Sequence, residues 1–403
     1  MNIPTNRKIV IIGGGIVGLA TAYQITNRLP NLVPIVLEKE PDVGMHQSGH
    51  NSGVLHSGIY YKPGSLKATN CREGKRMMEQ FCQENGVPYE ICGKVIVAVD
   101  DEEVPRLKTI FERGQQNGVV CRWIGPDELR ELEPHASGVQ AIHVPEAGIA
   151  DFHGVCRELR RLVEQRGGTI ELNQRVTQIQ RRADAIVIRT RNGREYAGRF
   201  LINCAGLYSD RVARLAGDPP PVQIVPFRGE YYELHPDARH LVKNLIYPVP
   251  NPQFPFLGVH FTRMVDGTVE CGPNAVWAWA REGYSKTRLN LRDMFEDLRY
   301  AGFRRLCARY WREGWEELRR SFSKRLFHAA LQRLVPELRI DQLVPGRSGV
   351  RAQAVSPDGS LVDDFLIVDA ERAMHVCNAP SPAATSSLRI GLTIVERLEK
   401  RLA

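Results

Sequence analysis

Cysteines in the spacings of metal sites or disulfide frameworks are missing from this sequence. The nine cysteines include no C-x-x-C pair and no spacing typical of metal ligands. Their odd number favours reduced thiols over a closed set of disulfides, which points to a reducing compartment. The cysteine pattern therefore predicts neither a metal site nor a disulfide-stapled secreted domain.

Long hydrophobic runs are missing as well. No stretch approaches the ~18 uninterrupted apolar residues that a membrane-spanning helix needs. The apolar run 9–20 is interrupted by glycines and no small-residue cleavage site follows it, so we expect a buried strand and helix there instead of a signal peptide. We predict a cytoplasmic protein that does not cross a membrane.

Acidic residues are scarce in one segment of a chain whose formal net charge is +8. Residues 281–326 hold 13 Lys and Arg against 7 Asp and Glu. Apolar side chains recur there at the spacing of one amphipathic helix, namely Trp311, Trp315, Leu318, Phe322 and Leu326. Such a helix fits a membrane surface, or packing on its own domain with a solvated basic face. The aromatics follow the apolar stripe and no nucleic-acid module is present, so nucleic acid is not a predicted partner.

A dinucleotide-binding fingerprint is the strongest positive signal. Gly13-x-Gly15-x-x-Gly18 follows the apolar segment KIVII and opens an Ala-rich helix. These glycines permit a tight turn, close approach of the backbone to a pyrophosphate, and close packing of helix on strand. Glu38 ends the next apolar segment, where its carboxylate can bind a ribose. An acid at this position favours FAD or NAD over NADP.

Polar side chains are dense in the loop that follows. Residues 50–61, HNSGVLHSGIYY, contain two imidazoles, a carboxamide, two hydroxyls and two phenols. The glycines permit close approach to a flat ligand, and histidine titrates near neutral pH, as a group that takes a substrate proton must. A polar surface loop is the alternative, but the position directly after the nucleotide-binding unit favours a functional site.

The order of motifs along the whole chain resembles the L-2-hydroxyglutarate dehydrogenase/oxidase family, which belongs to the FAD-dependent, D-amino-acid-oxidase-like oxidoreductases. Loop 50–61 carries the most specific part of the resemblance. The later motifs are Asn203-Cys-Ala-Gly206, Gly258-Val-His260-Phe, Gly272-Pro-Asn-Ala275, Gly349-Val-Arg351-Ala-Gln353 and Asn378-Ala-Pro-Ser-Pro-Ala-Ala384.

The resemblance implies an α/β fold, with a Rossmann-type FAD-binding domain interleaved with an antiparallel-sheet substrate domain. The implied FAD-binding parts are residues 1–85, 147–221 and 341–403. The implied substrate-domain parts are residues 86–146 and 222–340, the second of which includes the basic insert at 284–333.

The resemblance also implies which residues contact FAD. The glycines would hold the pyrophosphate and Glu38 the adenosine ribose, while the segment 380–386 would turn backbone N–H groups and a helix N-terminus toward the flavin. The full implied set is Gly13, Gly14, Gly15, Gly18, Glu38, Ser48, His50, Asn51, Ser52, Val176, Ala205, Gly206, Pro382, Ala383, Ala384 and Thr385.

The implied substrate is a small 2-hydroxy diacid, which needs groups for two carboxylates and one base. Arg351 is the first candidate for binding a carboxylate of the substrate, because a guanidinium can donate two parallel hydrogen bonds to a carboxylate. Tyr60, Tyr61 and Arg228 are candidates for the other end, with an ion pair as the alternative role of the arginine. His56 and His260 are jointly the candidate bases.

The implied reaction is oxidation of L-2-hydroxyglutarate to 2-oxoglutarate, with hydride transfer from C2 to flavin N5 and electrons passed to a quinone or to O2. The basic segment favours a quinone acceptor and a peripheral location on the inner face of the cell membrane. An amine or amino-acid oxidase of the glycine or sarcosine oxidase type is one alternative. A flavin-binding protein without catalysis is the other.

Overall fold

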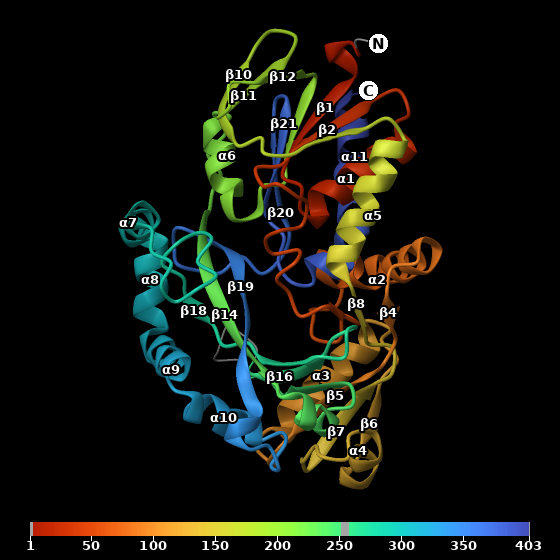
Figure 1. Cartoon of the computed structure of the whole chain (residues 1–403), viewed down its shortest axis with the longest axis vertical. Coiled ribbons are helices and arrows are strands. Elements are labelled where there is room, and N and C mark those ends of the chain that lie inside the picture. Colours follow the sequence, from red (N-terminus) through yellow and green to blue (C-terminus); the bar gives the residue numbers. More distant parts are fainter. Residues whose placement is uncertain (1–2, 251–257, 403) are drawn as a thin grey trace.

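A six-stranded sheet forms the upper half of the molecule in the computed structural model, which describes residues 3–250 and 258–402 (Figure 1). Three separate stretches of chain contribute its strands, in the order β20-β21-β13-β1-β2-β9. Neighbours are parallel except for β20 and β21. The strands are β1 (Lys8–Ile12), β2 (Val33–Leu37), β9 (Thr169–Glu171), β13 (Phe200–Asn203), β20 (Leu366–Ala370) and β21 (Ala373–Asn378).

Both faces of this sheet are covered, which explains the uninterrupted apolar sequence of β1. Ile9 and Ile11 pack in a core with the helices on one face, and Val10 packs on the other face with Ile186 of the small hairpin sheet. The first face carries α1 (Ile16–Arg28), α5 (Phe152–Gln165) and α11 (Ala383–Leu402). The second carries α6 (Ser209–Leu215) and the antiparallel sheet of β10 (Val176–Arg181), β11 (Ile186–Thr190) and β12 (Glu195–Gly198).

A nine-stranded sheet forms the lower half, and the two long strands β14 and β19 reach from it toward the upper half (Figure 1). Its neighbours are antiparallel except for β5 and β15, which are parallel. The parallel pairing of β5 with β15 differs from the predicted, wholly antiparallel sheet. It is possible because the chain passes through the upper half between these two strands. The strands are β5 (Lys94–Ala98), β6 (Arg122–Ile124), β7 (Gln140–Val144), β14 (Gln223–Leu234), β15 (Leu245–Pro248), β16 (His260–Arg263), β17 (Val269–Gly272), β18 (Val276–Trp277) and β19 (Leu343–Val355).

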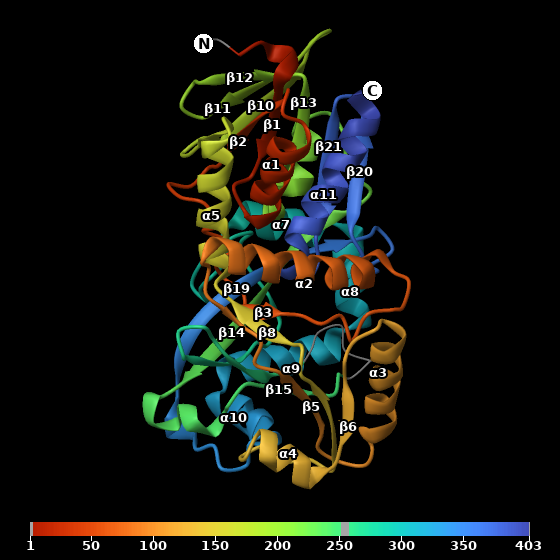
Figure 2. The same cartoon turned by 90° about the vertical axis from the view of Figure 1, so that its right-hand side faces the viewer.

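Helix α2 crosses the molecule between the two halves, as Figure 2 shows. The side chain of Ser65 accepts a hydrogen bond from the backbone N–H of Ala68 and so caps its start. A small sheet lies below it, formed by β3 (Val54–Leu55), β4 (Tyr89–Glu90) and β8 (Gly148–Ala150). Helix α2 spans Leu66–Asn85, and the lower sheet carries α3 (Val104–Gln116) and α4 (Pro126–Leu132). The described residues also form 3-10 helices at Thr5–Arg7, Gly206–Tyr208, Pro236–Leu241 and Ile340–Gln342. The domain boundaries given above stay a prediction.

The basic insert folds as four short helices, so the prediction of one amphipathic helix was wrong. They are α7 (Leu291–Arg299), α8 (Ala301–Arg309), α9 (Trp311–Phe322) and α10 (Lys324–Gln332). Ser323 ends α9 and caps α10 by accepting a hydrogen bond from the N–H of Leu326, which places Leu326 on a different helix from Trp311. None of the described helices is long and apolar enough to span a bilayer.

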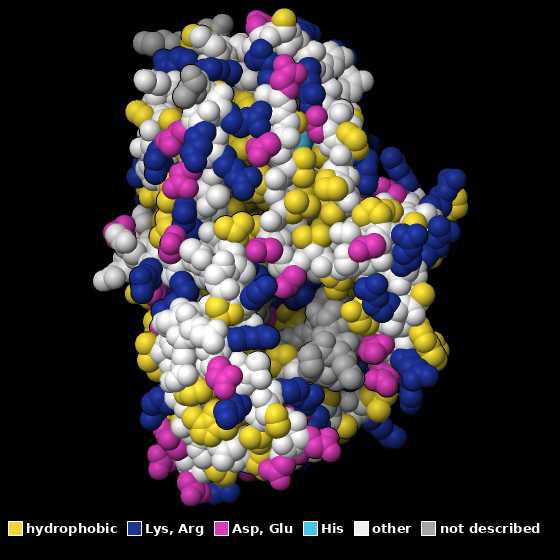
Figure 3. Space-filling view, turned by 180° about the vertical axis from the view of Figure 1, so that it is seen from behind, with side chains coloured by type: hydrophobic (Ala, Val, Ile, Leu, Met, Phe, Trp, Pro, Cys, Tyr) yellow, Lys and Arg dark blue, Asp and Glu magenta, His cyan; other side chains and the backbone are white. Residues whose placement is uncertain are grey.

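Helix α9 also packs in the opposite sense from an ordinary amphipathic helix. Its buried positions are polar, because Glu317 accepts a hydrogen bond from the N–H of Ala275 at 3.0 Å and Ser321 donates one to Glu230 at 2.6 Å. Trp311 is 62 % exposed, and further exposed apolar side chains of the insert are Leu291, Phe295, Leu298, Trp315, Phe322 and Leu326. Figure 3 shows hydrophobic side chains among Lys and Arg on the projecting edge formed by α7–α9. The apolar stripe therefore faces solvent.

Candidate active site

One large cavity lies between the two halves and collects nearly all of the predicted site residues. Its volume is about 1960 Å³, well above the roughly 300–1,000 Å³ of a site for one drug-sized ligand. Its wall includes the carboxyl ends of β1 and β2, loop 44–61, β14, β16, β19 and the start of α11. The cavity is large enough to hold a long cofactor and a substrate together.

The glycine turn between β1 and α1 has the conformation that the fingerprint requires. Gly13 has φ +111°, and a Cβ atom added there would lie 2.4 Å from the carbonyl oxygen of Cys204. A Cβ atom at Gly18 would lie 2.0 Å from the carbonyl oxygen of Gly13, so Gly18 serves the packing of α1 on the strand. Gly13 and Gly15 line the cavity, whereas Gly14 and Gly18 do not.

Glu38 lies at the end of β2 and is 8 % exposed. Its carboxylate accepts hydrogen bonds from the N–H of Gly14 at 2.6 Å and from the N–H of Glu40 at 2.9 Å. These bonds hold the carboxylate against the glycine turn, where it lines the cavity. This is the position predicted for a ribose-binding acid.

The predicted loop connects the turn to the lower half. Ser48 accepts a hydrogen bond from the N–H of Ile16 in the first turn of α1, at 2.9 Å. Asn51 accepts one from the N–H of Gly53 and so fixes the loop's own turn. His50 Nδ1 lies 3.0 Å from the carbonyl oxygen of Ser348 on β19. Ser48, His50, Asn51 and Ser52 all line the cavity.

The start of α11 closes the cavity from another side. Thr385 accepts a hydrogen bond from the backbone N–H of His56 at 3.2 Å and donates one to the carbonyl oxygen of Val54 at 3.1 Å. These two bonds connect segments that lie more than 300 residues apart in the sequence. Pro382, Ala383, Ala384 and Thr385 line the cavity, as do Val176, Ala205 and Gly206.

These features fit a bound dinucleotide. The N-termini of α1 and α11 both open onto the cavity, and helix N-termini favour anionic groups such as a pyrophosphate. Gly15 is the N-cap of α1 and has no side chain, so the backbone of that turn can approach a ligand closely. The donor groups and the space are therefore those that FAD needs.

His260 is the first residue of β16, is 5 % exposed and lines the cavity. Its Nδ1 lies 2.9 Å from the carbonyl oxygen of Gly258, so Nδ1 carries the proton and Nε2 keeps a free lone pair. Its ring stacks on Tyr247 with 4.0 Å between centroids. Burial, opposed by the Gly258 contact and reinforced by the charge of Lys94, lowers the pKa of His260 to about 4.

His56 lines the same cavity, and no hydrogen bond joins its ring to a described side chain. Burial lowers the pKa of His56 to about 3, with further contributions from the charges of Lys94, His260, Lys67 and Arg351. Both histidines are therefore neutral near pH 7 and able to accept a proton.

Arg351 and Arg228 lie on the paired strands β19 and β14, and both line the cavity. Arg228 is 5 % exposed and donates to Glu230 at 3.1 Å and to the carbonyl oxygen of Ser285 at 3.2 Å. Its charge is thus largely balanced within the protein, which weakens its case as a substrate carboxylate ligand. Arg351 lines the cavity near Tyr61 and Tyr231.

Lys94, Tyr231 and Tyr247 belong to this region but were missed from the sequence. Tyr231 and Tyr247 line the cavity, and Lys94 lies behind Tyr60 and Tyr247 with its Nζ 4.8 Å from each ring centroid. Lys94 directly precedes the apolar run VIVA, and a lysine at a strand end usually reaches solvent. The available signal was that this strand is apolar on both faces, which leaves its first residue no route to solvent.

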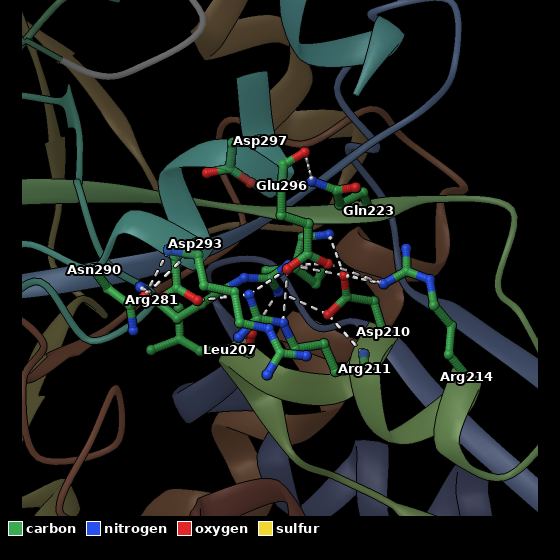
Figure 4. Close-up of polar contacts among 12 residues, drawn as sticks. Leu207, Asp210, Arg211, Arg214, Gln223, Arg281, Asn290, Asp293, Glu296 and Asp297 are labelled. Carbon is green, nitrogen blue, oxygen red and sulfur yellow. Dashed lines mark hydrogen bonds and ion pairs between the residues drawn. The ribbon is translucent and has the colours of Figure 1, made fainter. Parts of the chain in front are cut away.

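A network of charged side chains joins helix α6 to the insert helix α7 (Figure 4). Arg281 donates to Asp210 at 2.7 and 3.0 Å and to the carbonyl oxygen of Leu207 at 2.8 Å. Arg211 donates to Asp293 at 2.6 Å, and Asp293 also accepts from the N–H of Arg281. The network fixes the insert beside the turn at Gly206.

Glu40, His46 and Glu282 lie together like metal ligands within the described part of the chain. However, the ammonium of Lys39 contacts both glutamates, at 2.6 Å for Glu282. This arrangement is an ion-pair cluster, and it supports no metal site.

Comparisons with known proteins agree with this geometry. A family model described as FAD dependent oxidoreductase matches residues 8–397. L-2-hydroxyglutarate dehydrogenase of Indibacter alkaliphilus is 50 % identical over 396 residues, covering 98 % of this chain and 99 % of that protein. The protein of the same name from Escherichia coli K12 is 46 % identical over 394 residues, covering 98 % and 93 %. Among solved structures, L-alpha-glycerophosphate oxidase of Mycoplasma pneumoniae with FAD bound has a TM-score of 0.81 at 22 % identity, covering 98 % of this chain and 95 % of that one.

Proposed function

This chain belongs to the family of FAD-dependent oxidoreductases, and from that membership we propose that it oxidises L-2-hydroxyglutarate to 2-oxoglutarate. The predicted fold class and cofactor class are confirmed by the family match and by the shared fold of a structure solved with FAD. The observation that carries the proposal is the meeting of His56, His260 and Arg351 at one cavity beside the glycine turn.

In this proposal FAD is held by the residues that line the upper part of the cavity. Gly13, Gly15 and the N-terminus of α1 bind the pyrophosphate, and Glu38 binds the ribose. The segment that begins α11 faces the flavin with its helix N-terminus. When bound, FAD supplies the acceptor for the hydride that leaves C2 of the substrate.

The chain's own residues position the substrate and take its hydroxyl proton. Arg351 binds the C1 carboxylate through its guanidinium. His260 offers a lone pair at Nε2, because its Nδ1 proton is held by the carbonyl oxygen of Gly258, and His56 is the second candidate base. Burial is the main cause of the lowered pKa values of both histidines, and the positive charge of Lys94 adds to it; a bound carboxylate offsets this charge and so makes either histidine a stronger base.

Anaerobic mixing tests the proposed reaction. Purified holoenzyme is mixed separately with L-2-hydroxyglutarate, D-2-hydroxyglutarate, L-lactate and glycine while the flavin absorbance is followed. We expect rapid bleaching by L-2-hydroxyglutarate alone. Bleaching by glycine instead would make the protein an amino-acid oxidase, and no bleaching by any substrate would leave a non-catalytic flavoprotein.

We further propose that the exposed surface of α7–α10 docks on an anionic lipid bilayer, where a quinone accepts the electrons. Trp311, Trp315 and Phe322 are 59–66 % exposed, and the segment 281–326 has almost twice as many basic as acidic residues. Aromatic side chains beside basic ones suit the boundary between lipid headgroups and acyl chains. The predicted location in the cytoplasm, at the inner face of the cell membrane, is part of this proposal.

Vesicle sedimentation tests the docking surface. The double variant Trp311→Ser with Trp315→Ser is expected to lose most binding to vesicles that contain phosphatidylglycerol, and high salt should weaken the parent protein's binding. Trp123→Ser is the matched control, because Trp123 is also exposed but lies on β6, away from the insert. Equal binding of all three proteins would exclude this surface, and electrons would then pass to O2 or a diffusible acceptor.

A further inference from the structure

Lys94 stands apart from the other buried basic side chains of the described residues. These are Lys75, Lys94, Arg228 and Arg281, which are 6 %, 2 %, 5 % and 0 % exposed. Lys75 pairs with Glu79, Arg228 with Glu230 and Arg281 with Asp210. No hydrogen bond or ion pair joins Lys94 to a described residue, and only the faces of two tyrosine rings lie against its ammonium. A buried cation without a counter-ion is costly for a protein to keep.

The two tyrosines beside Lys94 also have unused polar groups. The hydroxyls of Tyr60 and Tyr247 are buried and form no hydrogen bond to a described residue. Thr262 lies near the Tyr247 hydroxyl without forming a hydrogen bond of normal geometry. Both tyrosines line the cavity, and their hydroxyls lie buried in its wall. Three donors that lie in or directly behind one part of the cavity wall, with no acceptor among the described residues, indicate an anion that the ligand brings.

This group lies next to the proposed bases. Tyr247 stacks on His260, and the charge of Lys94 acts on both His260 and His56. Arg351 also acts on His56. A ligand with its hydroxyl at the histidines therefore has one cation at Arg351 and a second at Lys94. That pattern matches a dicarboxylate and leaves one cation unbalanced when the ligand is a monocarboxylate.

We propose that Lys94, Tyr60 and Tyr247 form the subsite for the second carboxylate of the substrate, with the tyrosine hydroxyls as direct donors and the ammonium as counter-ion. This subsite rests on the proposed function and adds to it the group that selects a diacid over a monoacid. Rejection of the monoacid follows because its apolar end would leave a buried ammonium and two hydroxyls unpaired.

Substrate comparison tests the subsite in the holoenzyme. Lys94→Met is expected to lower kcat/KM for L-2-hydroxyglutarate by about 100-fold and to change kcat/KM for L-2-hydroxypentanoate, which has a methyl group in place of the second carboxylate, by less than about threefold. Tyr60→Phe with Tyr247→Phe should act in the same direction while keeping both rings. Lys75→Met is the matched control, because it also removes a buried lysine but lies on α2 with its own partner. It should lower the two kcat/KM values equally or not at all.

Ligand binding separates failure of the subsite from failure of the proposed function. Glutarate and pentanoate are redox-inert, and their binding is followed through the flavin absorbance spectrum. We expect the parent protein to bind glutarate at least tenfold more tightly than pentanoate, and Lys94→Met to lose this preference. If L-2-hydroxyglutarate reduces the flavin but Lys94→Met affects both substrates equally, the subsite is wrong and the function stands. If L-2-hydroxyglutarate fails to reduce the flavin, the function is wrong, and the preference for glutarate decides the subsite independently.

Discussion

Arg281 and Asp210 form a fully buried ion pair, with both side chains 0 % exposed and two hydrogen bonds of 2.7 and 3.0 Å between them. Asp210 lies on α6, beside the turn at Gly206, and Arg281 precedes the insert helix α7. The pair therefore connects the proposed cofactor site to the segment with the exposed aromatic surface. Burial raises the pKa of Asp210, but the charge of Arg281 and its hydrogen bonds outweigh this effect and lower the pKa overall.

Removing one partner of this pair should destabilise the protein strongly. Arg281→Met leaves the buried carboxylate of Asp210 with the partly exposed Arg214 as its counter-ion, and we expect a loss of about 3–5 kcal/mol in the free energy of unfolding, measured in urea. Arg281→Met combined with Asp210→Leu should recover part of that loss, because the carboxylate that Arg281 balances is then removed as well. Arg339→Met is the control, since its pair with Asp341 is exposed on both sides and should contribute nothing measurable. A loss no larger than that of the control would show that the pair does not connect the two segments.

A methyl group at Gly18 should prevent FAD binding. Its Cβ atom would lie 2.0 Å from the carbonyl oxygen of Gly13, so Gly18→Ala must displace α1 from the turn. We expect a colourless or largely FAD-free protein, measured by the flavin absorbance per chain. Gly314→Ala is the control on helix α9, because nothing lies within 4 Å of its added Cβ atom, and it should keep full FAD content. Normal FAD content in Gly18→Ala would contradict the close packing of α1 on the turn.

The upper half of the fold could be predicted because local patterns and tertiary packing agree there. The uninterrupted apolar run of β1, which is buried on both faces, and the glycine turn that follows it are both determined by neighbouring residues. The insert could not be predicted in the same way. The helical spacing of its apolar residues continues past Ser323, although the chain ends α9 there and the Ser323 side chain caps α10. The polar partners of α9 lie far from it in the sequence. Sequence periodicity shows that a stripe exists, and packing alone decides which side is buried.

The candidate site divides in a similar way. His56, His260 and Arg351 carry their chemistry visibly in the sequence, and the structure places all three at one cavity. The sequence did not mark Lys94 as a substrate ligand, because that role depends on the lack of a counter-ion around its ammonium in the described part of the folded chain. That absence becomes visible only when Tyr60, Tyr247 and the neighbouring strands are in place.

Loss of the His260 imidazole should slow the oxidation itself. His260→Asn keeps an N–H group near the carbonyl oxygen of Gly258 but removes the Nε2 lone pair. We expect the rate of flavin reduction by L-2-hydroxyglutarate to fall by about 10²–10⁴-fold at saturating substrate, measured by stopped-flow absorbance, with FAD content unchanged. His240→Asn should have no effect, because His240 is exposed and contacts the carbonyl oxygen of Asp237 and the ring of His135, neither of which lines the cavity. An unchanged rate in His260→Asn would assign the base to His56 alone.

Titration of Lys94 should appear as a pH dependence that only the diacid senses. Burial lowers the pKa of Lys94 to about 8, while that of the nearby Cys71 is raised to about 12 and those of His56 and His260 are lowered to about 3 and 4. Of these groups, Lys94 alone changes charge between pH 6 and 10. Because the cationic form binds the second carboxylate, kcat/KM for L-2-hydroxyglutarate should be constant below pH 8. Above it, the value should fall by about tenfold for each pH unit. The profile for L-2-hydroxypentanoate should lack this fall, and Lys94→Met should lack it with both substrates. A fall that persists in Lys94→Met would assign the titration to another group.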